Sequence, residues 1–262
     1  MKKTFYLVIL FVSFTLFAND TTLNFSHVSA SNLTLVKTIS YGSGVNQVGI
    51  SIPTQSEVLP FGVNGISGEG DLLFLIDNIN KRVQSFNLKT TVIKPVFSLP
   101  SSTFRNISLL NSDIVLYNTK KDMVYRQSGA VAIPLIKGTV EQVRRADKTT
   151  VYPYTKFLGA NRVRIVSSAT DYINLTFSDV SLLSFVLVSE DSSGRFHAVI
   201  EVANRVRYLI VLNNSGELLS KTLLPNAEVF RPDNDLFIKP DGTAYYITAD
   251  RAGLHLYRGG VK

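Results

Sequence analysis

The feature that most constrains this chain is a long succession of short apolar runs, each about the length of a β-strand. The runs are rich in Val, Ile, Leu, Phe, Tyr and Thr, and turn-forming residues separate each run from the next. Apolar residues do not keep the spacing of an amphipathic helix over the roughly 11 to 18 residues that such a helix needs. The sequence therefore predicts an all-β fold of antiparallel strands. We expect strands at residues 33–39, 72–76, 82–86, 92–97, 113–117, 131–136, 161–166, 172–177, 182–188, 196–202, 206–212, 244–248 and 254–257.

A weak internal repeat favours one all-β architecture. Residues 60–100 contain a strand, a glycine turn, a second strand ending at Asp77, a polar turn, and a third strand that begins at Arg82. Residues 184–225 and 233–260 repeat this order, a shorter copy lies at 104–136, and 140–179 is expected to contain another. A period of about 40 to 50 residues is typical of a β-propeller, whose blades are four-stranded antiparallel meanders.

The length of the chain predicts six blades, with five as the alternative. The residues that follow an 18-residue leader allow about 41 residues for each of six blades, but only five copies are visible in the sequence. The last copy stops after three strands. An unpaired edge strand invites aggregation, so we expect an N-terminal strand at 34–40 to complete the last blade and close the ring. Residues 19–57 would supply the rest of the sixth blade.

The unit at 60–100 carries a resemblance to a known family. The residues concerned are Pro60, Phe61, Gly62, Asp71, Asp77, Asn80, Arg82, Val83 and Phe86. Together they resemble the NHL repeat, in which Pro-x-Gly precedes an apolar strand and Asn-x-Arg-Val-x-x-Phe follows an acid. The fit is partial over 184–225 and 233–260, and poor over 104–179. The resemblance implies a six-bladed propeller and leaves the activity open, because NHL-like propellers include protein- and RNA-binding modules as well as lyases and lactonase-like enzymes.

The first 18 residues have the pattern of a secretory signal peptide. Lys2 and Lys3 precede an uncharged apolar run at 5–17, and Ala18 is a small residue ahead of polar Asn19. The apolar run is shorter than the roughly 20 residues of a membrane-spanning helix. We therefore predict a signal peptide over 1–18, cleaved near Ala18, and a single propeller domain over 19–262. The mature protein is expected to be a bacterial periplasmic or secreted monomer without a transmembrane segment.

Composition and motifs exclude several classes of function. The chain has no cysteine, which excludes disulfides, thiolate metal sites and cysteine nucleophiles. The net charge of +7 is spread along the chain. The sequence contains no Gly-x-Ser-x-Gly elbow, phosphate-binding loop or dinucleotide fingerprint. We therefore predict no cofactor and no nucleotide chemistry.

Basic and aromatic residues cluster between positions 144 and 164. They are Arg144, Arg145, Lys148, Tyr152, Tyr154, Phe157, Arg162 and Arg164. Such a mixture can neutralise and stack on a single-stranded nucleic acid. The signal peptide argues against a nucleic-acid partner, so we interpret these residues as a solvated blade face. An anionic glycan or another polymer of the cell envelope is the alternative ligand.

The acids and histidines provide the candidates for a catalytic or metal site, although no spacing motif joins them. The candidates are Glu57, Asp77, Glu201, Asp250, His27, His197 and His255. Asp77, Glu201 and Asp250 occupy equivalent repeat positions after second strands, where an acid commonly accepts hydrogen bonds at a turn. His197 and His255 lie within expected strands and fit structural roles, and His27 is expected to be exposed. We therefore assign no catalytic or cofactor-binding residue, and metal ligands stay unknown.

These observations favour an exported, non-enzymatic binding or scaffolding propeller that engages a protein or glycan partner in the cell envelope. The alternative is a metal-assisted lyase or hydrolase, similar to lactonases or streptogramin lyases, with its site at the central channel. That alternative requires acids or histidines from several blades to converge on one pocket.

Overall fold

The computed structural model describes residues 18–54, 60–110, 112–137, 153–168 and 171–260. Within these ranges the chain is almost entirely β-structure, with two short 3-10 helices, η1 (Phe25–His27) and η2 (Ala203–Arg205). The predicted all-β fold is therefore confirmed. The described helices are far too short to cross a bilayer.

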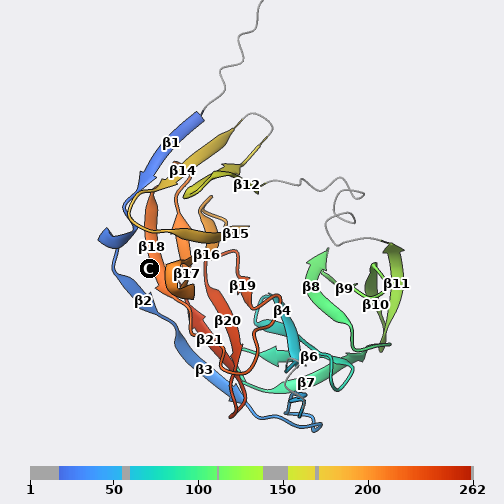
Figure 1. Cartoon of the computed structure of the whole chain (residues 1–262). Coiled ribbons are helices and arrows are strands. Elements are labelled where there is room, and N and C mark those ends of the chain that lie inside the picture. Colours follow the sequence, from blue (N-terminus) through green and yellow to red (C-terminus); the bar gives the residue numbers. More distant parts are fainter. Residues whose placement is uncertain (1–17, 55–59, 111, 138–152, 169–170, 261–262) are drawn as a thin grey trace, which may run out of the picture.

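The described strands form five units along a nearly closed arc (Figure 1). Unit 1 contains β4 (Val63–Glu69), β5 (Leu72–Asp77), β6 (Arg82–Asn87) and β7 (Ile93–Ser98). Unit 2 contains β8 (Phe104–Leu110), β9 (Asp113–Asn118), β10 (Met123–Ser128) and β11 (Val131–Lys137). Unit 3 contains β12 (Tyr154–Gly159), β13 (Arg162–Val166), β14 (Tyr172–Phe177) and the N-terminal strand β1 (Ala18–Leu23).

The remaining two units also include strands from the N-terminal segment. Unit 4 contains β15 (Leu182–Glu190), β16 (Phe196–Val202), β17 (Arg207–Leu212), β18 (Leu218–Leu223) and β2 (Ala30–Asn32). Unit 5 contains β19 (Leu236–Ile238), β20 (Ala244–Ala249), β21 (Leu254–Gly259) and β3 (Thr34–Ile39). Units 1 and 2 share one eight-stranded sheet, but β7 and β11 pair only through Ser98 and Val131. They are therefore two four-stranded meanders joined at their outer edges.

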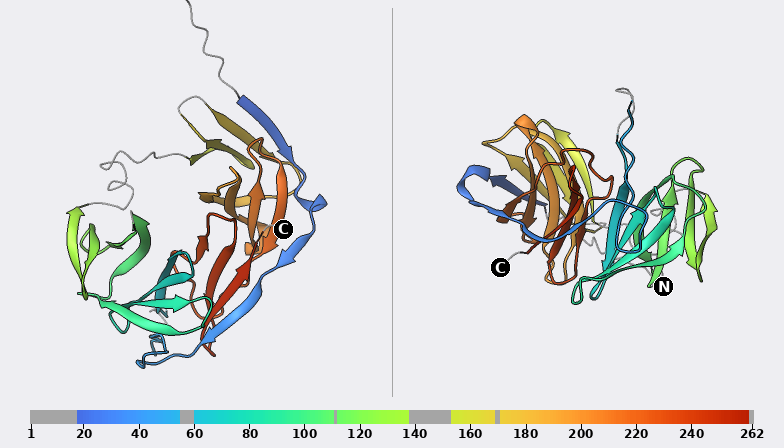
Figure 2. Two further views of the ribbon diagram at one scale, coloured as in Figure 1. Left: turned by 180° about the vertical axis from the view of Figure 1, so that it is seen from behind. Right: turned by 90° about the horizontal axis from the view of Figure 1, so that it is seen from below.

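Residues 18–39 form an N-terminal strap along the outer edges of units 3, 4 and 5 (Figures 1 and 2). In the strap, β1 runs parallel to β14 and β2 runs parallel to β18. The third strap strand, β3, is antiparallel to β21 and supplies the fourth strand of the last unit. The strap therefore covers three edges that would otherwise expose unpaired backbone groups.

Apolar clusters hold neighbouring units together. Phe177 of unit 3 packs against Phe185 of unit 4, with ring centroids 6.2 Å apart. A second cluster joins units 4 and 5, a third joins units 5 and 1, and a fourth joins units 1 and 2. In the described residues, no such cluster joins unit 2 to unit 3. Each sheet thus buries its faces against its neighbours, as repeated sheets must.

The expected number of blades is not confirmed. The described residues form five units, and closure of a ring between units 2 and 3 is not seen among them. Residues 19–57 were expected to supply part of a sixth blade. Their described strands instead add edges to units 3, 4 and 5, because each of these units has an outer strand available for pairing.

Candidate functional site

The first strand of each unit faces the inside of the arc (Figure 1). Four of these inner strands, β4, β8, β15 and β19, border a cavity of about 900 Å³. We call it the inner cavity. It lies where the ends of β4, β15 and β19 come together with the middle of β8. A volume of this size suits a small-molecule ligand, because such sites usually measure about 300 to 1,000 Å³.

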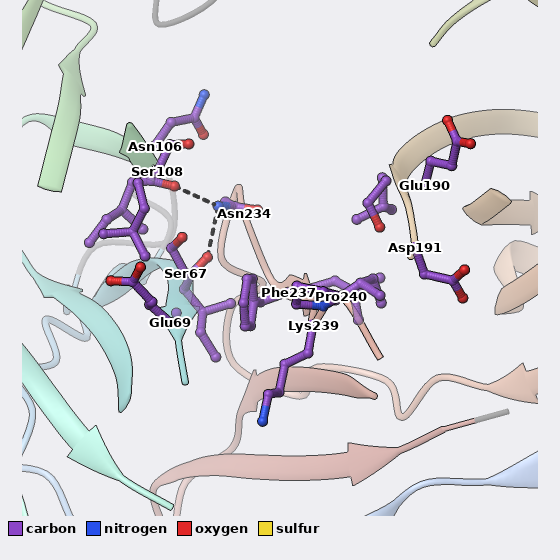
Figure 3. A pocket seen from close by; sticks show the side chains of 18 of the residues that line it. Ser67, Glu69, Asn106, Ser108, Glu190, Asp191, Asn234, Phe237, Lys239 and Pro240 are labelled. Atoms are coloured by element: carbon purple, nitrogen blue, oxygen red, sulfur yellow. Dashed lines mark hydrogen bonds between the residues drawn. The ribbon is translucent and has the colours of Figure 1, made fainter. Parts of the chain in front are cut away.

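Uncharged polar side chains gather on one wall of the inner cavity. Ser67, Asn106, Ser108 and Asn234 lie together there (Figure 3). The Asn234 side-chain amide donates to the carbonyl oxygens of Ile66 at 2.9 Å and of Ile107 at 3.4 Å. These bonds tie the segment before β19 to units 1 and 2, so they fix the position of this wall. Amide and hydroxyl groups in this arrangement can hydrogen-bond a ligand that carries hydroxyl groups.

Charged side chains stand on both walls of the cavity (Figure 3). Glu69 lies beside the polar wall and accepts a hydrogen bond from the Ser112 hydroxyl at 3.0 Å. Glu190 and Asp191 lie on the opposite wall, at the end of β15. Lys239 follows β19 and also borders the cavity. The cavity therefore has carboxylates on two facing walls.

Asp191 organises the turn between β15 and β16. Its Oδ1 accepts from the backbone amides of Ser193 at 2.9 Å and Arg195 at 3.1 Å. Its Oδ2 accepts from Arg195 Nε at 2.7 Å and lies 2.9 Å from His197 Nε2. Burial raises the pKa of Asp191, but these hydrogen bonds outweigh burial and lower the pKa to about 2. Asp191 is therefore ionised at neutral pH.

A second cavity of about 410 Å³ lies between units 4 and 5. It shares Val188, Asn234 and Leu236 with the inner cavity. Its charged lining consists of Glu201, Arg207, Arg231, Asp233 and Asp235. Arg207 and Asp235 form an ion pair at 2.7 Å, so these two charges largely satisfy each other.

Asp77 and Asp250 hold turns. Asp77 is fully buried and accepts hydrogen bonds from Arg82 Nε at 3.1 Å and from the Gly49 amide at 3.0 Å. Asp250 accepts from the amides of Ala252 at 2.7 Å and Gly253 at 3.1 Å. These are turn-capping contacts.

The remaining acids lie in different places. Glu201 borders the second cavity and lies 3.4 Å from Arg205 Nη1. Glu57 lies outside the described residues. In the described part of the chain, no three His, Asp or Glu side chains form a group that could hold a metal ion.

The three histidines do not come together. His27 is exposed in η1. His255, on β21, lies 2.7 Å from Asp250 Oδ2 and 2.9 Å from the Thr38 hydroxyl, so it links the last unit to the strap. His197 is fully buried beside Asp191. Burial lowers the pKa of His197 more than Asp191 raises it, so the imidazole is neutral at neutral pH.

The basic and aromatic segment does not form a described surface as a whole. Four of its members, Arg144, Arg145, Lys148 and Tyr152, lie outside the described residues. Arg164 stacks over the Tyr172 ring at 4.0 Å and donates to Asn174 at 2.8 Å. Arg162 is exposed, and Tyr154 and Phe157 are about half exposed on β12.

Sequence reasoning missed the residues that line the inner cavity. The candidate acids predicted from the sequence lie at the ends of second strands, whereas the residues that line the cavity belong to first strands and the turns that follow them. The repeat contains a usable signal, because it marks which strand of each unit is the innermost. Ser67, Glu69, Asn106, Ser108 and Glu190 are all polar residues within such first strands.

Comparison with known proteins finds solved structures that resemble this chain in part, at low sequence identity. The sequence matches no protein-family model and no curated protein significantly. One similar solved structure is a PQQ-bound aldose sugar dehydrogenase from Streptomyces coelicolor, with 7% identity, 88% of this chain and 98% of that chain covered, and a TM-score of 0.44. A gluconolactonase from Xanthomonas campestris has 8% identity and a TM-score of 0.34, and the match covers 89% of this chain and 90% of that chain. A virginiamycin B lyase from Staphylococcus aureus has 10% identity and a TM-score of 0.28, and the match covers 76% of this chain and 70% of that chain.

These comparisons correct one expectation from the sequence. The non-enzymatic binding or scaffolding propeller is the wrong interpretation, because the proteins with a similar fold are mostly named as enzymes. They agree better with the alternative, a lyase or hydrolase. The likeness stops at the fold, so no site, substrate or cofactor is transferred from these proteins to this chain. The kind of partner and the monomeric state stay predictions.

Proposed function

We propose that this chain is a hydrolase or lyase that acts on a small, hydroxyl-rich substrate, such as a sugar-derived ester or lactone, in the inner cavity. One observation carries the proposal: short polar side chains from the inner strands line a cavity of about 900 Å³, with carboxylates on two facing walls. Ser67, Asn106 and Ser108 would bind substrate hydroxyl groups. The ring of Phe237 offers an apolar surface for the carbon skeleton.

The facing carboxylates support proton transfer. In hydrolysis, Glu69 or Glu190 would accept a proton from the attacking water, and that proton would then pass to the departing oxygen. In a lyase reaction, the same carboxylate would accept the proton from carbon as the leaving group departs. The proposal assigns these proton transfers to the carboxylates of Glu69 and Glu190, which border the cavity from facing walls.

Turnover of a substrate panel tests the proposal. The purified protein would be assayed with sugar esters, lactones and glycosides, alongside Glu69→Gln and Glu190→Gln. We expect turnover of at least one class, and a loss of about 100-fold or more in kcat/KM in at least one variant, because general acid–base catalysis commonly contributes that much. The control is Glu217→Gln, an exposed acid on the β17–β18 turn, which should retain full activity. A folded protein that turns over none of these classes would contradict the proposal.

We infer that residues 1–18 direct export of a monomeric domain over 19–262 to the periplasm or the medium. Lys2, Lys3 and the apolar run at 5–17 support this inference. We also propose that the units are NHL-like repeats and that a sixth blade closes the ring. Support for the repeat comes from Asp77, Asn80 and Arg82, which form one hydrogen-bonded network in unit 1.

A further inference from the structure

A serine and a histidine lie opposite each other at the wall of the inner cavity. Ser189 of β15 pairs with His197 of β16 in the antiparallel ladder, and Ser189 borders the cavity. The Ser189 hydroxyl and His197 Nδ1 are both buried, and neither atom has a hydrogen-bond partner among the described residues. Side chains of directly opposed residues point to the same face, with Cβ atoms about 4.5 to 5.5 Å apart. The two residues that carry these unpartnered atoms are therefore neighbours across the ladder.

The contact with Asp191 determines which nitrogen of His197 can accept a proton. His197 Nε2 lies 2.9 Å from the Asp191 carboxylate, which only accepts hydrogen bonds when ionised. The ring proton is therefore on Nε2, and Nδ1 presents a lone pair. Burial lowers the pKa of His197, which keeps the imidazole neutral and able to act as a base. Arg195 Nε and two backbone amides hold Asp191 in place.

Unit 5 covers this arrangement from the other side. The Ser192 amide and hydroxyl both donate to the Pro240 carbonyl oxygen, at 2.8 and 2.7 Å. Gly242 packs so closely that a Cβ there would lie 3.1 Å from Asp191 Oδ2 and 3.6 Å from His197 Cε1. Water is therefore largely kept away from the imidazole, which strengthens its interaction with the carboxylate. Two unpartnered polar atoms in such a dry site cost stability that an apolar pair would not cost.

We propose that Ser189 is a catalytic nucleophile, that His197 is its base, and that Asp191 orients the histidine. This inference rests on the proposed function and narrows it to the hydrolysis of esters or lactones. In this narrower form, His197 takes the proton-transfer role that direct attack by water would give to Glu69 or Glu190. Rotation of the Ser189 side chain about χ1 would bring its hydroxyl toward His197 Nδ1 and the cavity. Long nucleophile–base distances are common before substrate binds.

The reaction balances without a co-reactant other than water. The Ser189 hydroxyl gives its proton to His197 Nδ1 as its oxygen bonds to the ester carbonyl carbon. The ester C–O bond breaks, and the alcohol leaves with the proton from the imidazolium. Water then attacks the acyl-serine and gives a proton to Nδ1, and the C–O bond to Ser189 breaks. Ser189 recovers that proton, and the acid is released.

Covalent labelling with a fluorophosphonate tests the inference without knowledge of the substrate. The purified wild-type protein should gain one phosphonyl group by intact mass, and peptide mapping should place it on Ser189. Ser189→Ala should abolish labelling, and His197→Gln should slow it by about 100-fold or more. Ser215→Ala is the control, because Ser215 is an exposed serine on the β17–β18 turn, away from the inner cavity. That control should label at the wild-type rate.

Several outcomes would overturn the inference. They are an unlabelled wild-type protein, a label on another residue, or a Ser189→Ala variant that still labels. Mapping on the wild-type protein makes the test independent of whether His197→Gln folds. Substrate turnover without Ser189 labelling would overturn this inference and leave the proposed function intact. Labelling of Ser189 without turnover of any substrate in the panel would support the nucleophile and count against the proposed substrate class.

Discussion

Asp77 shows how one buried carboxylate can organise a turn and the segment that packs on it. Its two oxygens accept hydrogen bonds from Gly49, Asn80, Arg82 and Gln84. Arg82 also donates to three carbonyl oxygens of residues 43–47. Only glycine fits at position 49, because a Cβ there would lie 2.3 Å from the Ile79 Cβ. The NHL-like residues of unit 1 thus fasten the strap's continuation to the sheet.

Replacing Asp77 with Asn should destabilise the protein strongly. The substitution keeps the shape of the side chain but removes the charge that pairs with Arg82, and it places amide hydrogens toward other donors. Breaking a buried ion pair from one side commonly costs about 3 to 5 kcal/mol. The free energy of unfolding in urea would measure the loss. Asp113→Asn is the control, because Asp113 pairs with Arg126 at 3.7 Å on the surface. Equal effects of the two substitutions would refute the role given to Asp77.

Single residues also show where sequence reasoning reaches its limit. The turn role of Asp77 could be predicted, because its partners lie three to seven positions away in the same repeat. The pairing of Ser189 with His197 could not, because it depends on the register of β15 against β16. A bulge between Leu187 and Ser189 shifts that register by one residue. A one-residue shift moves a side chain to the other face of the sheet, so the sequence alone leaves both arrangements open.

Among the elements, the N-terminal strap departs most from what its sequence indicates. Its strand β1 has the sequence ANDTTL, and every residue of β2 is exposed, so neither segment has the apolar alternation that marks a strand. They become strands because the outer edges of β14 and β18 present unpaired backbone groups. Two anchors fix the strap between them. Asp179 accepts from the amides of Phe25 and Ser26, and Lys221 Nζ donates to the Phe25 carbonyl oxygen at 2.6 Å.

Removing the strap's first two strands should promote association of the protein. A chain that begins at Thr34 keeps β3 but leaves the edges of β14 and β18 unpaired, and exposed edges recruit strands from other molecules. We expect higher-order species in size-exclusion chromatography with light scattering, together with a lower urea midpoint. A chain that begins at Asn19 is the matched control and should behave as the full strap does. A monomeric, equally stable Thr34 chain would contradict the role given to the strap.

At the scale of the whole molecule, stacking of units on their neighbours determines the architecture. Repetition at intervals of about 40 residues correctly predicted a succession of stacked antiparallel sheets, because each unit must bury its faces against the next. The number of units was harder to predict, because strands of the N-terminal segment join distant units instead of forming one of their own. Units 1, 4 and 5 each pack against two neighbours through apolar clusters. Among the described residues, units 2 and 3 each pack against only one neighbouring unit through such a cluster.

This arrangement predicts an uneven distribution of stability along the arc. If stability is the sum of each unit and its interfaces, units 2 and 3 should open more readily than the units between them. Hydrogen exchange followed by mass spectrometry would measure this, after correction for intrinsic exchange rates. Peptides from β9, β10 and β13 should exchange faster than peptides from β5, β16, β17 and β20. Equal protection in all five units would contradict this prediction and would support the proposed ring closure, which would hold units 2 and 3 from their far sides as well.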